Sequence, residues 1–164
     1  MTWSFVIQPP FIALASIDRL DLLGHILGEI SVAEAVVEEC ARCGPIPVPC
    51  LRSLPWVKVY PDLPPGDGSL VLDLGRGEQQ TILLARYHGA ELVVIDERRA
   101  RNLAEYLGLR VTGTLGLLAK AKVSGLIPSF RAAAAAMRDQ GLYFSRGLIE
   151  RLGCQLGETS ESRQ

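Results

Sequence analysis

Residues 91–95, with the sequence Glu-Leu-Val-Val-Ile, constrain the fold of this chain more than any other segment. They follow the break at Gly89-Ala90, and Asp96 comes directly after them. A short run of consecutive apolar residues rich in valine and isoleucine is typical of a strand buried on both faces, as in a parallel sheet. We therefore expect a central strand here, with Asp96 at its carboxyl end.

Strand and helix patterns alternate along the rest of the chain. Apolar runs predict strands at residues 3–7, 29–32, 56–60, 91–95 and 109–111, and helical spacing predicts helices at residues 11–17, 20–27, 33–43, 77–88, 98–107, 115–124, 129–139 and 147–156. In the helix at 77–88, Ile82, Leu83 and Ala85 are expected to face inward. Clustered prolines predict loops around the strand within residues 44–68. The alternation predicts an α/β fold with a central parallel sheet covered by helices on both faces.

The chain length and composition favour one folded domain. With 164 residues, of which 48% are hydrophobic and 21% charged, we expect a single domain at residues 1–157 and a polar tail at residues 158–164. The net charge of -1 argues against sequence-independent coating of nucleic acid, which requires an excess of lysine and arginine. No apolar stretch approaches the roughly 20 residues of a membrane span. The amino terminus has no charged n-region, so we expect a cytoplasmic protein.

The cysteines leave two interpretations. Cys40 and Cys43 form a C-x-x-C pair, and Cys50 follows closely, but a structural zinc ion needs four ligands. Only Cys154, His25 or His88 could supply the fourth, and none has pair spacing. We therefore expect thiols without a metal, and no disulfide in the cytoplasm.

Acidic residues mark a candidate metal site. Glu38 and Glu39 lie late in the helix at 33–43, Glu78 opens the helix at 77–88, and Asp96 ends the central strand. Carboxylates that converge at the carboxyl edge of a parallel sheet suit Mg²⁺ or Mn²⁺, which prefer oxygen ligands. Each acid also has a structural interpretation: a solvated helix face for Glu38 and Glu39, a favourable charge at a helix N-terminus for Glu78, and a cap of the helix beginning near residue 97 for Asp96.

The chain resembles the PIN-domain family, in particular the uncharacterised branch similar to VapC-type toxin ribonucleases. The similar stretches are residues 11–15, 17–23, 32–39, 77–85, 94–101, 113–118 and 142–152, which together span nearly the whole chain in the family's order. The resemblance implies a three-layer α/β/α PIN-like fold with a central parallel sheet. It also implies a ribonuclease that uses Mg²⁺ or Mn²⁺ bound by a cluster of acids.

The resemblance assigns catalytic and metal-binding roles to Glu39, Glu78 and Asp96, which match the second, third and fourth acidic positions. Two positions depart from the pattern. Ile7 stands where the first strand normally ends in an acid, and Gln80 stands where the branch often has a second glutamate. We therefore expect a degenerate site with reduced or absent activity.

Two functions stay open at this point: a metal-dependent ribonuclease of the toxin type, and a catalytically inactive PIN-fold module that binds RNA or protein. A purely structural dimer subunit is a third possibility. The resemblance implies RNA, a cognate antitoxin and a second copy of the chain as partners, with the helices around residues 20–27 and 115–118 as a dimer surface. Arg98, Arg99 and Arg101 are expected on a solvated helix face, although they could contact phosphate. Thr114, at a helix start, is expected to be a helix N-cap, although its hydroxyl could also lie at the edge of the site.

Overall fold

The sheet has five parallel strands in the order β3-β2-β1-β4-β5 in the computed structural model, which describes residues 3–42, 44–64 and 73–159. The strands are β1 (Ser4–Val6), β2 (Ile30–Ala33), β3 (Val57–Tyr60), β4 (Leu92–Val94) and β5 (Val111–Thr112). Phe5 of the central strand β1 pairs with Ser31 on one side and Val93 on the other. The predicted parallel sheet is thus confirmed, but its middle strand is β1, and β4, which was expected to be the central strand, lies beside it.

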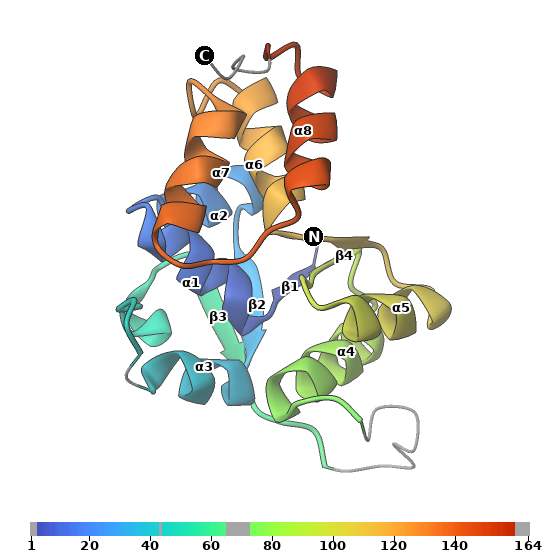
Figure 1. Ribbon diagram of the computed structural model, residues 1–164. Helices are drawn as coiled ribbons and strands as arrows, with labels where there is room; N and C mark the ends of the chain where they lie inside the picture. The colour runs from blue at the N-terminus through green and yellow to red at the C-terminus, as the bar shows by residue number, and fades with distance from the viewer. Residues whose placement is uncertain (1–2, 43, 65–72, 160–164) are drawn as a thin grey trace.

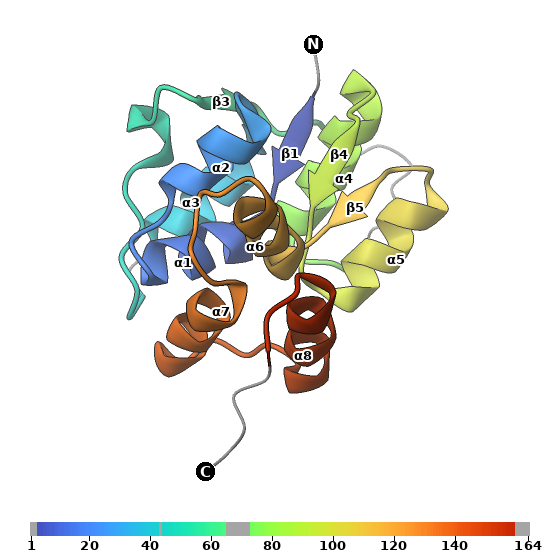
Figure 2. The same cartoon turned by 90° about the horizontal axis from the view of Figure 1, so that it is seen from above.

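Helices cover both faces of this sheet. They are α1 (Gln8–Ser16), α2 (Asp21–Leu27), α3 (Glu34–Ala41), α4 (Arg76–His88), α5 (Arg98–Tyr106), α6 (Thr114–Val123), α7 (Phe130–Asp139) and α8 (Arg146–Gln155), with a short 3₁₀ turn η1 at Leu51–Ser53. Helix α4 packs against β1, β2 and β4 on one face, and α2 and α6 lie together on the other (Figure 1 and Figure 2). This arrangement is the expected three-layer α/β/α fold.

The inner strands are apolar because no face of theirs reaches water. Phe5, Val6, Val93, Val94 and Ile95 all have an exposed fraction of 0%. A strand between two helical layers buries both of its alternating sets of side chains, which explains the continuous apolar run at residues 92–95. Among the described residues, no helix is long and apolar enough to cross a membrane.

Two local details differ from the sequence-based expectations. Helix α1 begins at Gln8, not at residue 11, so Pro9 and Pro10 lie inside its first turn. Proline is tolerated there because the first N–H groups of a helix have no partner within the helix. In α4, Leu84 is buried in place of Leu83, which is only partly covered.

The carboxyl-terminal helices α6, α7 and α8 pack beside one another above the sheet in Figure 1. Residues 140–145, here called the α7–α8 connector, cross in front of α1 between the two helices (Figure 1). Glu158 was assigned to the tail, but its carboxylate accepts hydrogen bonds from the backbone N–H groups of Phe130 (2.7 Å) and Arg131 (3.0 Å) at the start of α7. Packed structure therefore extends at least to this residue, and residues 160–164 of the predicted tail lie outside the described residues.

Candidate metal site of the acidic edge

Glu39 and Glu78 line one pocket of about 720 Å³, here called the Glu39 pocket. It lies where β1 runs into α1, and its wall is completed by the end of α3, the start of α4 and the α7–α8 connector. Residues that contribute to it include Ile7, Gln8, Cys40, Gly75, Gln140 and Leu142. Two of the three predicted site residues, Glu39 and Glu78, therefore border the same space, which is the carboxyl end of the central strand.

The carboxylate of Glu39 is held by the first turn of α4. Its Oε1 accepts a hydrogen bond of 2.9 Å from the backbone N–H of Gly77. A β-carbon at position 77 would collide with this carboxylate, so only glycine permits the close approach. At the same end of α3, the Gln8 side chain donates to the Glu39 carbonyl oxygen at 2.9 Å. The Glu39 side chain is therefore fixed by residues from two other helices.

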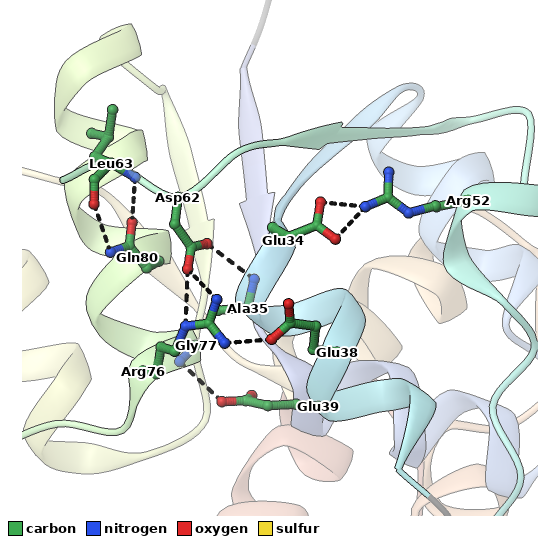
Figure 3. Close-up of polar contacts among 10 residues, drawn as sticks. All are labelled: Glu34, Ala35, Glu38, Glu39, Arg52, Asp62, Leu63, Arg76, Gly77 and Gln80. Carbon is green, nitrogen blue, oxygen red and sulfur yellow. Dashed lines mark hydrogen bonds and ion pairs between the residues drawn. The ribbon is translucent and has the colours of Figure 1, made fainter.

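Arg76 and Asp62 join α3 to α4 beside this pocket (Figure 3). The Arg76 guanidinium donates to the Asp62 carboxylate at 2.9 and 2.6 Å and also pairs with Glu38. The other oxygen of Asp62 accepts from the Ala35 N–H at 3.1 Å, in the first turn of α3. Glu38 is thus an ion-pair partner, whereas its neighbour Glu39 turns toward Gly77 (Figure 3).

Gln80 has a structural role that glutamate could not fill. Its side-chain oxygen accepts from the Leu63 N–H at 2.8 Å, and its side-chain nitrogen donates to the Leu63 carbonyl oxygen at 3.1 Å (Figure 3). An ionised glutamate has acceptors only, so it would face the carbonyl oxygen without a proton to donate. Gln80, which departs from the family pattern, therefore holds the segment after β3 against α4.

Glu97 is an acid near the site that the sequence interpretation missed. Burial raises the pKa of Glu78 above its ordinary value, the negative charges of Glu97 and Glu39 raise it further, and the Gly75 backbone amide partly opposes this. Glu97 is also the N-cap of α5, since its carboxylate accepts from the Ala100 N–H at 2.8 Å. The only sequence signal was its place directly after Asp96.

Asp96 lies at the carboxyl end of β4, as predicted, but both of its carboxylate oxygens bind the start of α6. Oδ1 accepts from the Thr114 N–H at 2.7 Å, and Oδ2 accepts from the Thr114 hydroxyl at 2.6 Å. The N-cap of α6 is Gly113, so the expected capping role of Thr114 is wrong, and its hydroxyl binds the site acid instead. The alternative in which Asp96 caps α5 is also wrong, because Glu97 does so.

Asp96 lines a second pocket of about 400 Å³, here called the Asp96 pocket. It lies between the start of α6, the second half of the α7–α8 connector and α8, and Arg101 also contributes to its wall. Neither Glu39 nor Glu78 borders this pocket, and Asp96 does not border the Glu39 pocket. The two pockets meet along the connector, which contributes residues 140–142 to one and residues 143–145 to the other.

Ile7 is 1% exposed and directly precedes α1, in the N-cap position. Its backbone N–H donates to the Val94 carbonyl oxygen at 3.2 Å, which continues the pairing of β1 with β4. The side chain touches the Glu39 pocket but packs in the hydrophobic core. An apolar side chain that ends the central strand offers no ligand to a cation.

The acids do not form a complete cation cage. Across residues 3–42, 44–64 and 73–159, no three His, Cys, Asp or Glu side chains are arranged to hold one metal ion. Glu39 and Glu78 share a pocket, whereas Asp96, which accepts hydrogen bonds from Thr114 at both oxygens, borders a different one. These residues fit at most a weak divalent site, and the metal-binding role of the three acids stays a prediction.

Of the described cysteines, only Cys40 lies in the core. Cys40 is buried, and burial together with the charge of Glu39 raises the pKa of its thiol to about 12, so it is protonated. Cys50 and Cys154 are exposed free thiols, while Cys43 lies outside the described residues.

The apolar side chains expected at a dimer surface are mostly buried within the protomer, where α2 packs on α6: Leu22, Leu23, Leu115, Leu117 and Leu118.

Comparison with known proteins agrees with this architecture. The DUF3368 family model, described as a PIN domain, matches residues 9–158. Among solved structures, the chain is similar to SSO1118, a PilT N-terminus domain protein from the hyperthermophilic archaeon Sulfolobus solfataricus P2, with a TM-score of 0.54 and 19% identity over 73% of this chain and 93% of that one. At that identity the likeness shows the fold alone. No curated protein matches the chain. The family match covers most of the sequence, and the chain therefore belongs to the PIN-domain family.

Proposed function

We propose that the protein is a PIN-domain nuclease-like protein of the metal-dependent ribonuclease toxin type, with a degenerate site in which Ile7 replaces the first acid. The observation that carries this proposal is the Glu39 pocket, where Glu39 and Glu78 meet at the carboxyl end of the central strand. Mg²⁺ or Mn²⁺ would activate water and neutralise phosphate charge there. Two carboxylates hold such ions more weakly than a fuller oxygen set, so we expect reduced or absent cleavage of RNA.

The negative charges around Glu78 favour a bound cation. Burial raises the pKa of Glu78, and the negative charges of Glu97 and Glu39 raise it further, so its carboxylate is repelled by these neighbours. A divalent cation between Glu39 and Glu78 would relieve that repulsion. Asp96 accepts hydrogen bonds from Thr114 and borders a different pocket from this pair.

Calorimetric titration with Mn²⁺ tests the proposal on the wild type and on Glu39→Gln and Glu78→Gln. Both variants lose a charged ligand and should bind Mn²⁺ at least tenfold more weakly, by about 1.4 kcal/mol. The matched control is Glu91→Gln, an exposed acid just before β4 at the opposite end of the sheet, which should bind like the wild type. A wild type without Mn²⁺ affinity would remove the metal-dependent enzyme from consideration.

The alternative is a catalytically inactive PIN-fold module that binds RNA or protein. The specific observation in its favour is Asp96, whose two oxygens both serve the start of α6. Binding of labelled RNA in a buffer with EDTA, combined with absence of cleavage in Mn²⁺, would favour this module over the enzyme.

The toxin type further implies a cytoplasmic protein with a cognate antitoxin, and the resemblance implies a homodimer. The surface for such a dimer must differ from the buried leucines of α2 and α6. Light scattering at concentrations well above micromolar should give the dimer mass. A monomer mass under those conditions would count against the dimer.

A further inference from the structure

Tyr143 is an exposed aromatic residue at the rim of the Asp96 pocket. It lies in the α7–α8 connector, and 90% of its surface is exposed. Leu148, on the first turns of α8, borders the same pocket and is also exposed. Exposed large apolar side chains that gather at the mouth of one pocket are typical of a binding surface rather than of a core.

The same pocket contains a guanidinium with free hydrogen-bond donors, close to the Asp96 carboxylate. Arg101 lines it and is only partly exposed. Within the described part of the chain, its one hydrogen bond is a long contact of 3.4 Å from Nη1 to the Ile95 carbonyl oxygen, and no carboxylate forms an ion pair with it. The Asp96 carboxylate lies close to this guanidinium, since its Oδ1 and the Arg101 Nη1 are both 2.8 Å from the place of a β-carbon at Gly113, but it accepts its hydrogen bonds from Thr114. The remaining N–H groups of the guanidinium can therefore bind an anionic oxygen.

Helix α8 adds positive potential beside the connector. Arg146 directly follows Ser145, which borders the pocket, and the first turn of α8 contains no acid. A cation at a helix N-terminus is unfavourable, because that end already carries the positive end of the helix dipole. A phosphate bound near this turn would relieve that repulsion.

We infer that the Asp96 pocket binds one unpaired nucleotide of single-stranded RNA, with its base stacked on Tyr143 and its phosphate near Arg101. An exposed aromatic ring next to a partly covered guanidinium matches the two chemical parts of a nucleotide. The inference rests on the proposed function and extends it, since the connector that carries Tyr143 also borders the Glu39 pocket. A strand held at Tyr143 would thus lie next to the candidate metal site.

The test measures the affinity of the full chain for fluorescein-labelled oligouridine and oligoadenosine by anisotropy, in EDTA so that no cleavage occurs. Tyr143→Ala should weaken binding between about fivefold and 100-fold, as expected for the loss of one stacked base. Tyr143→Trp should retain or improve it. Tyr106→Ala is the matched control, because Tyr106 is 80% exposed on α5 and borders neither pocket, and it should bind like the wild type.

The salt dependence of binding tests the phosphate contact separately. Arg101→Gln should lower the slope of log affinity against log salt by roughly one, since one phosphate contact is lost. Arg110→Gln is the control, because Arg110 is exposed and precedes β5 at the other end of the sheet. Thermal melting of Tyr143→Ala should match the wild type, as the side chain is outside the core.

The possible failures are distinguishable. If the wild type binds Mn²⁺ and RNA but Tyr143→Ala binds RNA like Tyr106→Ala, the inference is overturned while the proposed function stands. If the pocket binds a protein segment instead of RNA, Tyr143→Ala should likewise keep the RNA affinity of Tyr106→Ala. If the wild type binds no oligonucleotide at all, the inference and the RNA-directed function both fall.

Discussion

Glu39 and Asp96 line different pockets at the carboxyl edge of the sheet and make related contacts with helix starts. Each accepts a hydrogen bond from the first turn of a helix, Glu39 from Gly77 of α4 and Asp96 from Thr114 of α6. Glu39 uses only Oε1, and its Oε2 accepts no hydrogen bond from any described residue, whereas Asp96 uses both oxygens. The comparison teaches that two acids at the same edge of a sheet can face different pockets, so their places in the sequence do not decide which of them could share a cation.

The same contact recurs at other helices of the chain. Asp62 accepts from the first turn of α3, Glu97 caps α5, and Glu158 accepts from the start of α7. Carboxylates are favourable at these ends because the unpaired N–H groups and the helix dipole attract negative charge. Several of the acids of this chain therefore bind helix starts, and in the Glu39 pocket two acids from different helices border the same space.

The largest expected effect comes from restoring the first acid. Ile7→Asp places a carboxylate where the side chain is 1% exposed, so without metal it should cost about 3–5 kcal/mol of stability. Added Mn²⁺ should recover part of that loss, because the new oxygen joins Glu39 and Glu78 and the ion binds only the folded state. Melting temperatures with and without Mn²⁺ measure both effects.

Val6→Asp is the control for that experiment. Val6 is equally buried but does not border the Glu39 pocket, so Mn²⁺ should not rescue the variant. If Mn²⁺ shifts Ile7→Asp no more than the wild type, Ile7 does not face the acidic cluster.

The comparison between the two acids predicts opposite rankings for stability and metal affinity. Asp96→Ala should cost roughly 3 kcal/mol, because it leaves the Thr114 N–H without its partner in the interior. Glu39→Ala should cost only about 1.5 kcal/mol, because a single hydrogen bond is lost. Mn²⁺ affinity should fall mainly in Glu39→Ala. Urea denaturation and calorimetry measure the two properties, and an equal loss of Mn²⁺ affinity in both variants would mean that Asp96 also binds the metal.

Gly77→Ala should push the Glu39 carboxylate away from the first turn of α4. The added β-carbon would collide with that carboxylate, so we expect a net loss of about 1–2 kcal/mol despite the better helix propensity of alanine. Gly147→Ala in α8 is the matched control, since its β-carbon would meet only the Ser145 hydroxyl oxygen at 3.9 Å. That variant should gain stability, by up to about 1 kcal/mol. If denaturant unfolding shows that both Gly77→Ala and Gly147→Ala gain stability, the Glu39 side chain moves away from the new β-carbon without loss of stability.

The smallest effect concerns pH. Since the pKa of Glu78 is raised in the folded protein, its ionisation opposes folding, and this cost is fully present above the folded pKa. Glu78→Gln should therefore melt slightly higher than the wild type at pH 7. The difference should shrink as the pH falls through the raised pKa, because the wild-type carboxyl is then protonated as well. Glu105→Gln, an exposed acid of α5, is the control, and an equal gain there would point to net charge rather than to the site.

Much of the architecture was predictable because it follows from local periodicity. The strands at residues 3–7, 29–32 and 91–95 and the helices between them were expected to within a few residues, since buried apolar runs and helical spacing are properties of short segments. The placement of Asp96 at the end of β4 followed from the same pattern. The starts of α1 and α6 were less predictable, because prolines and a glycine there allow more than one boundary.

By itself, the sequence determined the α/β alternation, the parallel sheet and the presence of Glu39, Glu78 and Asp96 at the ends of their elements. Only the tertiary structure decided which of these acids share a pocket and which oxygens stay free. The deciding contacts join Gly77 to Glu39 across 38 positions, Thr114 to Asp96 across 18, and Gln80 to Leu63 across 17. Such contacts depend on how whole elements pack, and a short segment of sequence carries no signal for a partner that packing brings near.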